Sequence, residues 1–429
     1  MRGLPDGGTA QAREVRVTRG SAVAGPRNMV QRRLMMQRQL ARREAIARGV
    51  KVAPLPAIAG LGGGGGAAPS APVLVQAASW RDLPGWDSDR VSEALPALLA
   101  SCRSIGAMSR ERAMGGAVAL ATTADDWRAA CAELSRAAGG SAQGRDARLR
   151  AAIEASFTPN LVGESILTGY YEPVLRGSLT RGGPFQTPLY APPAEHVQRD
   201  QPGSERPVHG QVVDGKLVPL PDRAAIQDGA LEGRGLELAW VDDPVDAFFL
   251  QIQGSGRIAL PDGKVLRLGF AGQNGQPYRA VGRSLIESGA LTRAGMSAQA
   301  IRDWMRDAGP EKTEALMAEN PSYIFFQPRP ELRDNQGPIG AMGIPLTPER
   351  SVAVDPSVVP LGAPVFVAGP NTRRLLAAQD TGGAIRGPGR GDLFRGWGDA
   401  AGAKAGTTHE AIRMWVLVPR QAAVAMGGN

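Results

Sequence analysis

The stretch that decides the fold runs from residue 377 to residue 406 and reads AAQDTGGAIRGPGRGDLFRGWGDAAGAKAG. In it, Asp380 directly follows an apolar segment and directly precedes Thr381-Gly382-Gly383. A carboxylate at a strand end, followed by glycines, lets a large substrate approach the backbone closely. Asp392 comes after a loop of Gly, Arg and Pro, so we expect this loop to fold back and bring the two acids together. Because Asp is also common beside Gly in turns, a purely structural role is the alternative.

The segments around this stretch predict strands and turns. Two apolar segments, 364–367 and 375–379, flank a Gly-Pro-Asn turn, and 412–418 (IRMWVLV) reads as a last strand. Earlier in the chain, 165–171 (SILTGYY) and 248–253 (FFLQIQ) are rich in aromatic and β-branched residues, which favours strands. With 56 Gly and 34 Pro in 429 residues, the composition also favours strands and turns over a helical bundle.

Helices are predicted mainly before residue 160. Apolar residues recur at helical spacing over 89–105, and a further helix is expected over 145–157. Between them, Thr123 with Asp126 three residues later is typical of a helix start with a capping box. Cys102 and Cys131 fall in this helical region, where a disulfide and two buried thiols are equally compatible with the sequence.

Helices return over 278–289 and 298–307, in the middle of the chain. The second of these has an apolar face formed by Ile301, Trp304 and Met305.

The positive charge is concentrated at the N-terminus. The formal net charge is +8, yet residues 1–51 alone hold 12 Arg and Lys against three acids. Residues 54–78 that follow are rich in Gly, Ala and Pro, so we predict that residues 1–78 are a disordered basic arm with a linker. Because the rest of the chain is close to neutral, the high pI does not indicate nucleic-acid binding.

The sequence predicts neither a metal site nor a membrane span. It contains two cysteines, no CxxC pattern and three scattered histidines, so we expect no metal and no cofactor. No stretch of about 20 apolar residues occurs. The first 78 residues contain neither an apolar segment before a small-residue cleavage site nor a cysteine that could carry a lipid, so the sequence does not indicate a route of export.

The tripeptide Asp380-Thr381-Gly382 also occurs in aspartic peptidases, which are therefore one alternative. Those enzymes need two such aspartates that share a proton, and this chain contains the tripeptide once. A peptidase would thus require a homodimer.

Several separated motifs together resemble those of the membrane-bound lytic murein transglycosylase A family, over about residues 85–420. The last block looks like the domain named for three aspartates, which correspond here to Asp355, Asp380 and Asp392. The motifs, in chain order, are LTGYYEP (167–173), FFLQIQGSGRI (248–258), GFAGQNGQPYRAVGRSLIESG (269–289), NPSYIFF (320–326), GPIGAMGIPLTPERSVAVDPSVVPLGAPVFV (337–367) and the Gly-rich block over 380–406.

This resemblance implies a mainly β fold with some helices. A double-psi β-barrel catalytic domain with N-terminal helices would comprise 79–176 and 319–425, and a smaller inserted β-barrel domain would comprise 177–318. A groove between the two domains would hold the glycan strand. Residues 1–78 would precede these two domains.

The resemblance also implies an activity and a set of site residues. The family cleaves the β-1,4 bond between N-acetylmuramic acid and N-acetylglucosamine in peptidoglycan and leaves a 1,6-anhydromuramic end. Asp380 would be the single acid/base, with a pKa raised by burial or by a nearby acid such as Asp392, and Asp392 and Asp355 would be supporting acids. Residues expected to bind the substrate are Thr168, Tyr170, Tyr171, Gln253, Ser255 and Tyr323.

The alternative role for these binding residues is strand packing. The resemblance further implies a monomer in the cell envelope, at the periplasmic face or the outer membrane. Its partners would be peptidoglycan glycan strands and cell-wall synthesis or outer-membrane proteins, and not nucleic acid. A second hypothesis is a glycan-binding protein that keeps the barrel and the groove but lacks activity.

Overall fold

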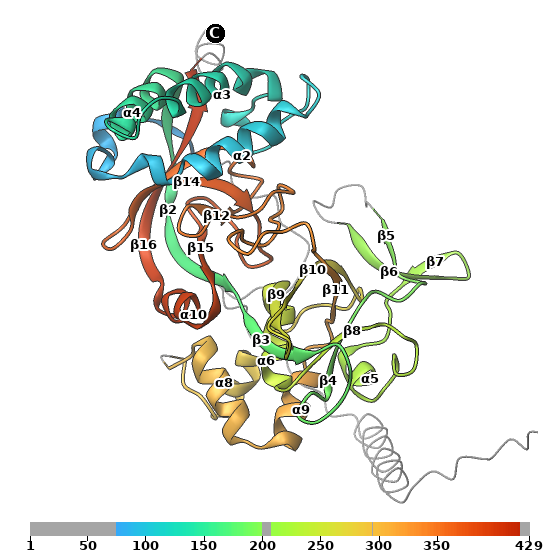
Figure 1. The fold of residues 1–429 in the computed structure, drawn as a ribbon. Coiled ribbons are helices and arrows are strands. Elements are labelled where there is room, and N and C mark those ends of the chain that lie inside the picture. Colours follow the sequence, from blue (N-terminus) through green and yellow to red (C-terminus); the bar gives the residue numbers. More distant parts are fainter. Residues whose placement is uncertain (1–73, 200–206, 294, 421–429) are drawn as a thin grey trace, which may run out of the picture. The chain divides into compact units, whose positions relative to one another are not determined.

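The computed structural model describes residues 74–199, 207–293 and 295–420. Its larger sheet closes on itself, because β2 pairs with β15 on one side and with β16 on the other (Figure 1). The strand order is β1-β2-β15-β12-β14-β13-β16. The strands are β1 (Gln76–Ala77), β2 (Phe157–Glu172), β12 (Ser351–Val354), β13 (Pro364–Ala368), β14 (Arg373–Asp380), β15 (Gly391–Trp397) and β16 (His409–Pro419).

The strand β2 is the seam of this barrel. It has 16 residues, and the stretch from Phe157, opposite Pro419, to Thr168, opposite His409, pairs antiparallel with β16. Along its second half it also pairs parallel with β15. Because paired strands lie about 4.8 Å apart, side chains of β2 are held directly beside those of the C-terminal strands.

Helices cover one end of the barrel (Figure 1). They are α2 (Leu95–Gly106), α3 (Ala124–Ala138) and α4 (Arg145–Ser156), and the predicted capping box of Thr123 and Asp126 is confirmed at the start of α3. Short 3-10 helices span Trp80–Asp82, Trp86–Ser88, Val91–Glu93 and Val118–Leu120. The sequence left the state of the two cysteines open, and the structure joins Cys102 of α2 to Cys131 of α3 in a disulfide.

A second β-region, residues 174–328, follows β2 and returns to the barrel. One sheet has the order β11-β10-β9-β3-β8-β4, and a smaller sheet has the order β5-β6-β7. The strands are β3 (Val174–Ser178), β4 (Thr187–Tyr190), β5 (Val197–Arg199), β6 (Val208–Val213), β7 (Lys216–Val218), β8 (Glu237–Val241), β9 (Ser255–Ala259), β10 (Val265–Gln273) and β11 (Ile324–Pro328). The helices are α5 (Arg223–Gln227), α6 (Pro244–Gln253), α7 (Val281–Glu287), α8 (Ala298–Asp307) and α9 (Pro310–Ala318).

The expected fold class, mainly β with helices and with two β-domains, is confirmed, although the ends of the parts differ from the predicted ones. Sheet membership extends the second β-region from 177–318 to 174–328, because β3 and β11 both belong to its six-stranded sheet. At the N-terminal end, β1 lies inside the predicted linker and pairs with β2. Residues 1–73 of the predicted arm lie outside the described residues.

One predicted strand is wrong. The segment FFLQIQ (248–253) forms the second half of α6, not a strand. Asp243 caps this helix by accepting hydrogen bonds from the backbone N–H groups of Val245 and Asp246, and Pro244 occupies its first position. Phe248 and Phe249 then pack with residues of α7, α8 and α9 in one buried cluster, so the aromatic run belongs to a helix face.

A buried ion-pair cluster lies where β2 ends. The carboxylate of Glu172 is 1% exposed and accepts hydrogen bonds from Arg257 of β9 (2.9 Å) and Arg267 of β10 (3.0 Å). The Arg257 guanidinium also lies 4.0 Å from the centre of the Trp397 ring. Glu172 therefore anchors the end of the seam strand to two strands of the second β-region.

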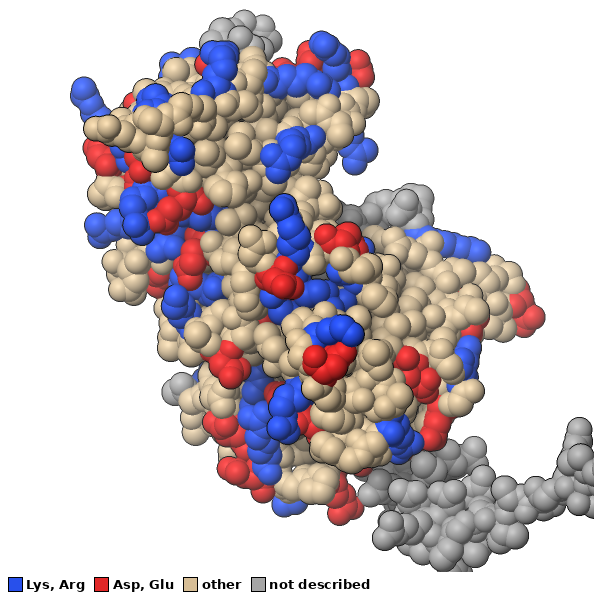
Figure 2. Space-filling model, viewed as in Figure 1, with Lys and Arg blue, Asp and Glu red and all other residues tan. Residues whose placement is uncertain are grey.

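Charges on the visible surface are mixed. Figure 2 shows Lys and Arg side chains interspersed with Asp and Glu on this face, without a broad stripe of one sign. Among the described residues, none of the helices combines the length and the apolar character needed to cross a bilayer.

Candidate active site

The local geometry of β14 aims Asp380 away from the helices. In the parallel pairing of β12 and β14, Val352 lies opposite Ala378 but Ala353 lies opposite Asp380, so a bulge accommodates Gln379. The Gln379 amide is fully buried and donates hydrogen bonds to the Ala97 carbonyl oxygen (2.7 Å) and to Ser101 (2.9 Å), both in α2. Bulges re-aim side chains, and this one frees Asp380 from the buried face.

The carboxyl group of Asp380 accepts three hydrogen bonds. Its Oδ1 accepts from the backbone N–H groups of Ala341 and Thr381, both at 2.9 Å, and its Oδ2 accepts from the Tyr170 hydroxyl at 2.7 Å. Burial raises the pKa of Asp380 above its ordinary value, although all three hydrogen bonds lower it. The residue itself remains partly exposed, so burial does not close it off from solvent.

The hydrogen bond from the Ala341 N–H to Asp380 depends on a close approach of the loop at residue 340 to β14. A Cβ atom on Gly340 would lie 2.6 Å from the Gln379 carbonyl oxygen, which is inside any real contact distance. The neighbouring Met342 N–H donates to that same carbonyl oxygen at 3.1 Å. Glycine at 340 therefore lets this loop lie against β14 and present the Ala341 N–H to the acid.

Asp392 lies in the same row of the sheet as Asp380. Both residues pair with Ala353 of β12, Asp380 from one side and Asp392 from the other. Two strand spacings separate their backbones by about 10 Å. Strand register therefore places both acids in one row of the barrel, and a close approach of the two carboxyl groups stays a prediction.

Asp392 is an acid with a perturbed pKa of its own. Burial first, and then the charge of Asp380, raise its pKa to about 6, while a hydrogen bond from Thr168 and the charge of Arg390 lower it. The Thr168 hydroxyl donates to Asp392 Oδ1 at 2.6 Å and accepts from Arg390 at 2.8 Å. For Asp380, burial rather than the expected charge of Asp392 is the cause of the raised pKa.

We expect Asp392→Asn to stabilise the fold at high pH only. The pKa of Asp392 is about 6 in the folded chain and near 3.8 in an unfolded one. The ionised group therefore destabilises the fold above pH 6, and this effect disappears as the pH falls towards 4. At pH 8 the free energy of unfolding of the variant should exceed that of the unmodified chain by about 1–3 kcal/mol. This difference should disappear towards pH 4. Unfolding measured by denaturant titration across this pH range tests it, and an equal gain at both ends would contradict it.

Asp355 supports the loop between the two acids. Its Oδ2 accepts from the Gly387 backbone N–H at 2.7 Å, and its Oδ1 accepts from the backbone and hydroxyl of Ser357. These hydrogen bonds and the nearby Arg386 lower the pKa of Asp355 despite its burial. Asp355 is therefore a carboxylate that fixes the 381–390 loop.

The four remaining predicted site residues have no hydrogen bond with Asp380 or Asp392 among the described contacts. The hydroxyl of Tyr171 accepts from Arg302 of α8 at 3.1 Å. Gln253 ends α6 and Ser255 begins β9, and both are partly exposed. Tyr323 is 5% exposed and packs between Tyr190 and Phe325, so it belongs to a hydrophobic core.

Sequence reasoning missed two polar residues that organise the site. Arg390 belongs to the quoted Gly-rich stretch, but its tripeptide Arg390-Gly391-Asp392 is common by chance. Gln379 carried a usable signal, because it is an amide at the end of an apolar strand directly before the acid. Its partners in α2 lie more than 270 residues away in the sequence.

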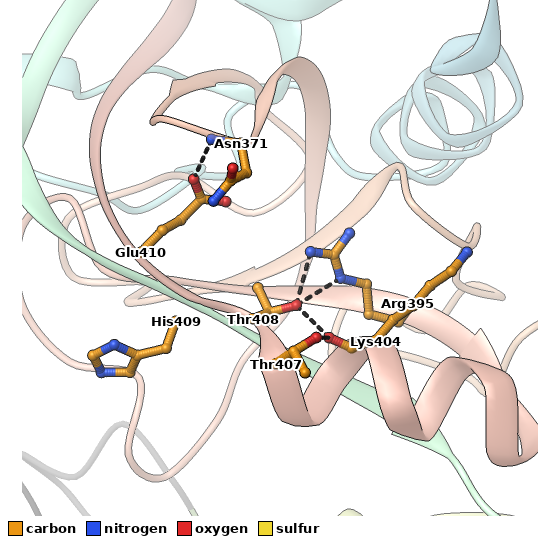
Figure 3. Close-up of a pocket in the computed structure, with 7 residues that line it drawn as sticks. All are labelled: Asn371, Arg395, Lys404, Thr407, Thr408, His409 and Glu410. Atoms are coloured by element: carbon orange, nitrogen blue, oxygen red, sulfur yellow. Dashed lines mark hydrogen bonds between the residues drawn. The ribbon is translucent and has the colours of Figure 1, made fainter. Parts of the chain in front are cut away.

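A separate cavity of about 260 Å³ lies beside α10 (Gly398–Thr407) (Figure 3). In it, Arg395 donates to the Thr408 hydroxyl, and Glu410 accepts from the Asn371 backbone N–H. Glu410 pairs with Leu167, whereas the residue next to Leu167, Thr168, faces Asp392. Its lining includes none of the three aspartates and neither Thr168 nor Tyr170, so this cavity is not the acid site. The lining residues are Asn371, Arg395, Lys404, Thr407, Thr408, His409 and Glu410.

Within the described ranges, no group of three or more His, Cys, Asp or Glu side chains is arranged to hold a metal ion.

The barrel and the second β-region each match a known protein domain. Residues 166–327 match the model of the MltA specific insert domain, and residues 350–418 match the model of the 3D domain. The first match corresponds to the second β-region, and the second spans β12 to β16 with all three aspartates.

Individual relatives agree with these matches. Membrane-bound lytic murein transglycosylase A of Escherichia coli K12 is 35% identical over 268 residues, 59% of this chain and 66% of that protein. The chain thus spans just under two thirds of that relative. The crystal structure of a membrane-bound lytic murein transglycosylase from Agrobacterium tumefaciens is 33% identical, with a TM-score of 0.72 over 82% of this chain and 99% of that one. Escherichia coli MltA with bound chitohexaose is 30% identical, with a TM-score of 0.53 over 69% and 83%.

A barrel with three aspartates, interrupted by an inserted β-region, defines the class of protein. This chain belongs to the membrane-bound lytic murein transglycosylase A family.

Proposed function

We propose that this chain is a peptidoglycan lytic transglycosylase. It would cleave the β-1,4 bond between N-acetylmuramic acid and N-acetylglucosamine and form 1,6-anhydromuramic ends, with Asp380 as the only acid/base. The family and the names of its relatives support this reaction. The observation that carries the proposal is a partly exposed carboxyl group whose pKa is raised by burial at the end of β14.

One carboxyl group suffices for this chemistry. Ordinary glycoside hydrolysis needs a second carboxylate to activate water or to attack the sugar. Here the C6 hydroxyl of the N-acetylmuramic acid residue is the nucleophile. Asp380 first protonates the leaving glycosidic oxygen and then, as a carboxylate, accepts the proton of the C6 hydroxyl. The acid returns to its starting state, and no water is consumed.

We propose supporting roles for the neighbouring residues. Asp392, held by Thr168 and Arg390, would place negative charge near the positive charge that develops on the sugar ring. Asp355 would support the site indirectly, by fixing the 381–390 loop. Gln253 and Ser255 keep a proposed role in binding sugar, because their amide and hydroxyl groups are partly exposed. We propose no substrate contact for Tyr323, which is buried.

The proposed location is the cell envelope, where the substrate lies. The relatives are named membrane-bound. The disulfide between α2 and α3 also supports an oxidising compartment, because such bonds are rare in reducing ones. A monomer acting on glycan strands, in a groove between the barrel and the second β-region, stays a prediction, as do partnerships with cell-wall synthesis or outer-membrane proteins.

Mass analysis of the soluble products from purified peptidoglycan tests this function. We expect muropeptides with anhydro ends, each lighter by one water than the product of hydrolysis. Reducing ends would instead indicate a hydrolase. Binding to peptidoglycan without any released product would indicate a glycan-binding protein. A truncated chain that starts at residue 74, and so keeps β1, serves as a second preparation.

A further inference from the structure

Two adjacent tyrosines of β2 have different partners. Tyr170 donates its hydroxyl hydrogen to Asp380 Oδ2 at 2.7 Å. Tyr171 points to the opposite face, where its hydroxyl accepts from Arg302 and its ring lies over Gly402 of α10. The chain thus offers two neighbouring phenols of which only one touches the acid.

The Tyr170 ring is fixed before substrate arrives. It pairs across the parallel ladder with Phe394, and the two ring centres are 5.4 Å apart. Burial first, and then the charge of Asp380, raise the pKa of Tyr170 well above its ordinary value. The hydroxyl therefore keeps its proton and acts as a hydrogen-bond donor.

The contacts of Asp380 leave one position on its carboxyl group open. A carboxylate has about four lone-pair sites, two on each oxygen. The two backbone N–H groups occupy Oδ1, and the Tyr170 hydroxyl occupies one site of Oδ2. The remaining site, on Oδ2, is the one that can carry the acidic proton.

We propose that Tyr170 is a positioning residue for the catalytic acid and not a sugar-binding residue. Its hydroxyl locks the rotation of the Asp380 carboxyl so that the open site of Oδ2 faces the leaving oxygen. After the proton has been donated, the same hydroxyl stabilises the carboxylate, because hydrogen bonds to charged oxygen are the stronger ones. This inference rests on the proposed function of Asp380.

Other charged groups near the acid are few. Asp392 of β15 lies on the strand next to Tyr170 and two strands from Asp380, and its charge interacts with both; the charge of Arg390 interacts with Asp392. Asp355 and Arg386 pair with each other in the neighbouring loops. Tyr170→Phe removes only a neutral hydroxyl and changes none of these charges.

The test compares Tyr170→Phe with Tyr171→Phe on soluble glycan fragments across pH. For Tyr170→Phe we expect kcat to fall about 10- to 100-fold with KM changed less than about threefold, which corresponds to the loss of one hydrogen bond to a charged group. The falling limb of the pH profile, where kcat decreases at high pH, should move to higher pH. The reason is that a hydrogen bond that favoured the ionised form of Asp380 is gone. Tyr171→Phe should leave the falling limb of the pH profile where it lies in the unmodified chain, because the Tyr171 hydroxyl contacts Arg302 and not the acid.

Three outcomes would overturn the proposal. A rise in KM with an unchanged pH profile would make Tyr170 a substrate-binding residue. Equal behaviour of the two variants would remove any special role, and an unmoved falling limb would leave only a packing defect. Tyr170→Met, which also lacks the hydroxyl, is measured alongside in case the Phe variant is unstable. Anhydro products from the unmodified chain test the proposed function independently.

Discussion

Asp380→Asn is expected to reduce turnover of peptidoglycan at least 1,000-fold, a loss of about 4 kcal/mol of transition-state stabilisation. Asparagine has nearly the same shape, and its carbonyl oxygen can still accept from the Ala341 and Thr381 N–H groups. Its amide cannot release a proton to the leaving oxygen. The rate is measured as release of soluble muropeptides, and circular dichroism checks the fold.

A matched control is available close by. Asp399 is exposed in the first turn of α10, so Asp399→Asn makes the same chemical change without touching the site. We expect it to retain full activity. Activity of Asp380→Asn within about tenfold of the unmodified chain, a difference of only ~1.4 kcal/mol, would show that Asp380 is not the acid.

Glu172→Gln is expected to lower the free energy of unfolding by about 3–5 kcal/mol, because removing one partner of a buried ion pair leaves uncompensated charge. Glu172 is 1% exposed and is the shared partner of Arg257 and Arg267, which are 6% and 5% exposed. The substitution keeps the volume and removes the only carboxylate that either guanidinium contacts in the described structure. Denaturant unfolding measures the change.

The control for this variant is an exposed glutamate with one arginine partner. Glu287 pairs with Arg283 one turn earlier in α7, and both side chains are more than half exposed. Glu287→Gln should change the free energy of unfolding by less than about 0.5 kcal/mol. If Glu172→Gln changed it as little, the buried cluster would contribute nothing beyond packing.

The features predicted correctly from the sequence are mostly local ones. The capping box at Thr123 and the α8 boundaries follow from spacing within one element. The strand prediction for 248–253 failed because a short apolar run does not distinguish a strand from a buried helix, and the Asp243-Pro244 start was overlooked. The Gly-rich segment that forms α10 was missed because glycine disfavours helices, whereas in the structure this helix packs against β2 and β15.

For the candidate site, too, local motifs could be read from the sequence, whereas contacts between distant residues could not. Asp380 as the acid stays a prediction from its own motif, and Thr168 and Tyr170 were predicted only as substrate-binding residues. Their real partners could not be predicted, since the Tyr170–Asp380 hydrogen bond joins residues 210 positions apart and depends on barrel register. Whether Cys102 and Cys131 meet likewise depended on how α2 packs on α3.

The seam strand β2 has a consequence for the order of folding. Its partners β15 and β16 are among the last described segments of the chain, and the Thr168–Asp392 hydrogen bond spans 224 positions. A ribosome releases these strands long after β2, and pairing across such a separation is slow because a long loop must close first. The second β-region, by contrast, is complete in one continuous stretch. A nascent chain therefore has no assembled acid site, and the proposed ability to cut glycan would arise only when the C-terminal strands dock.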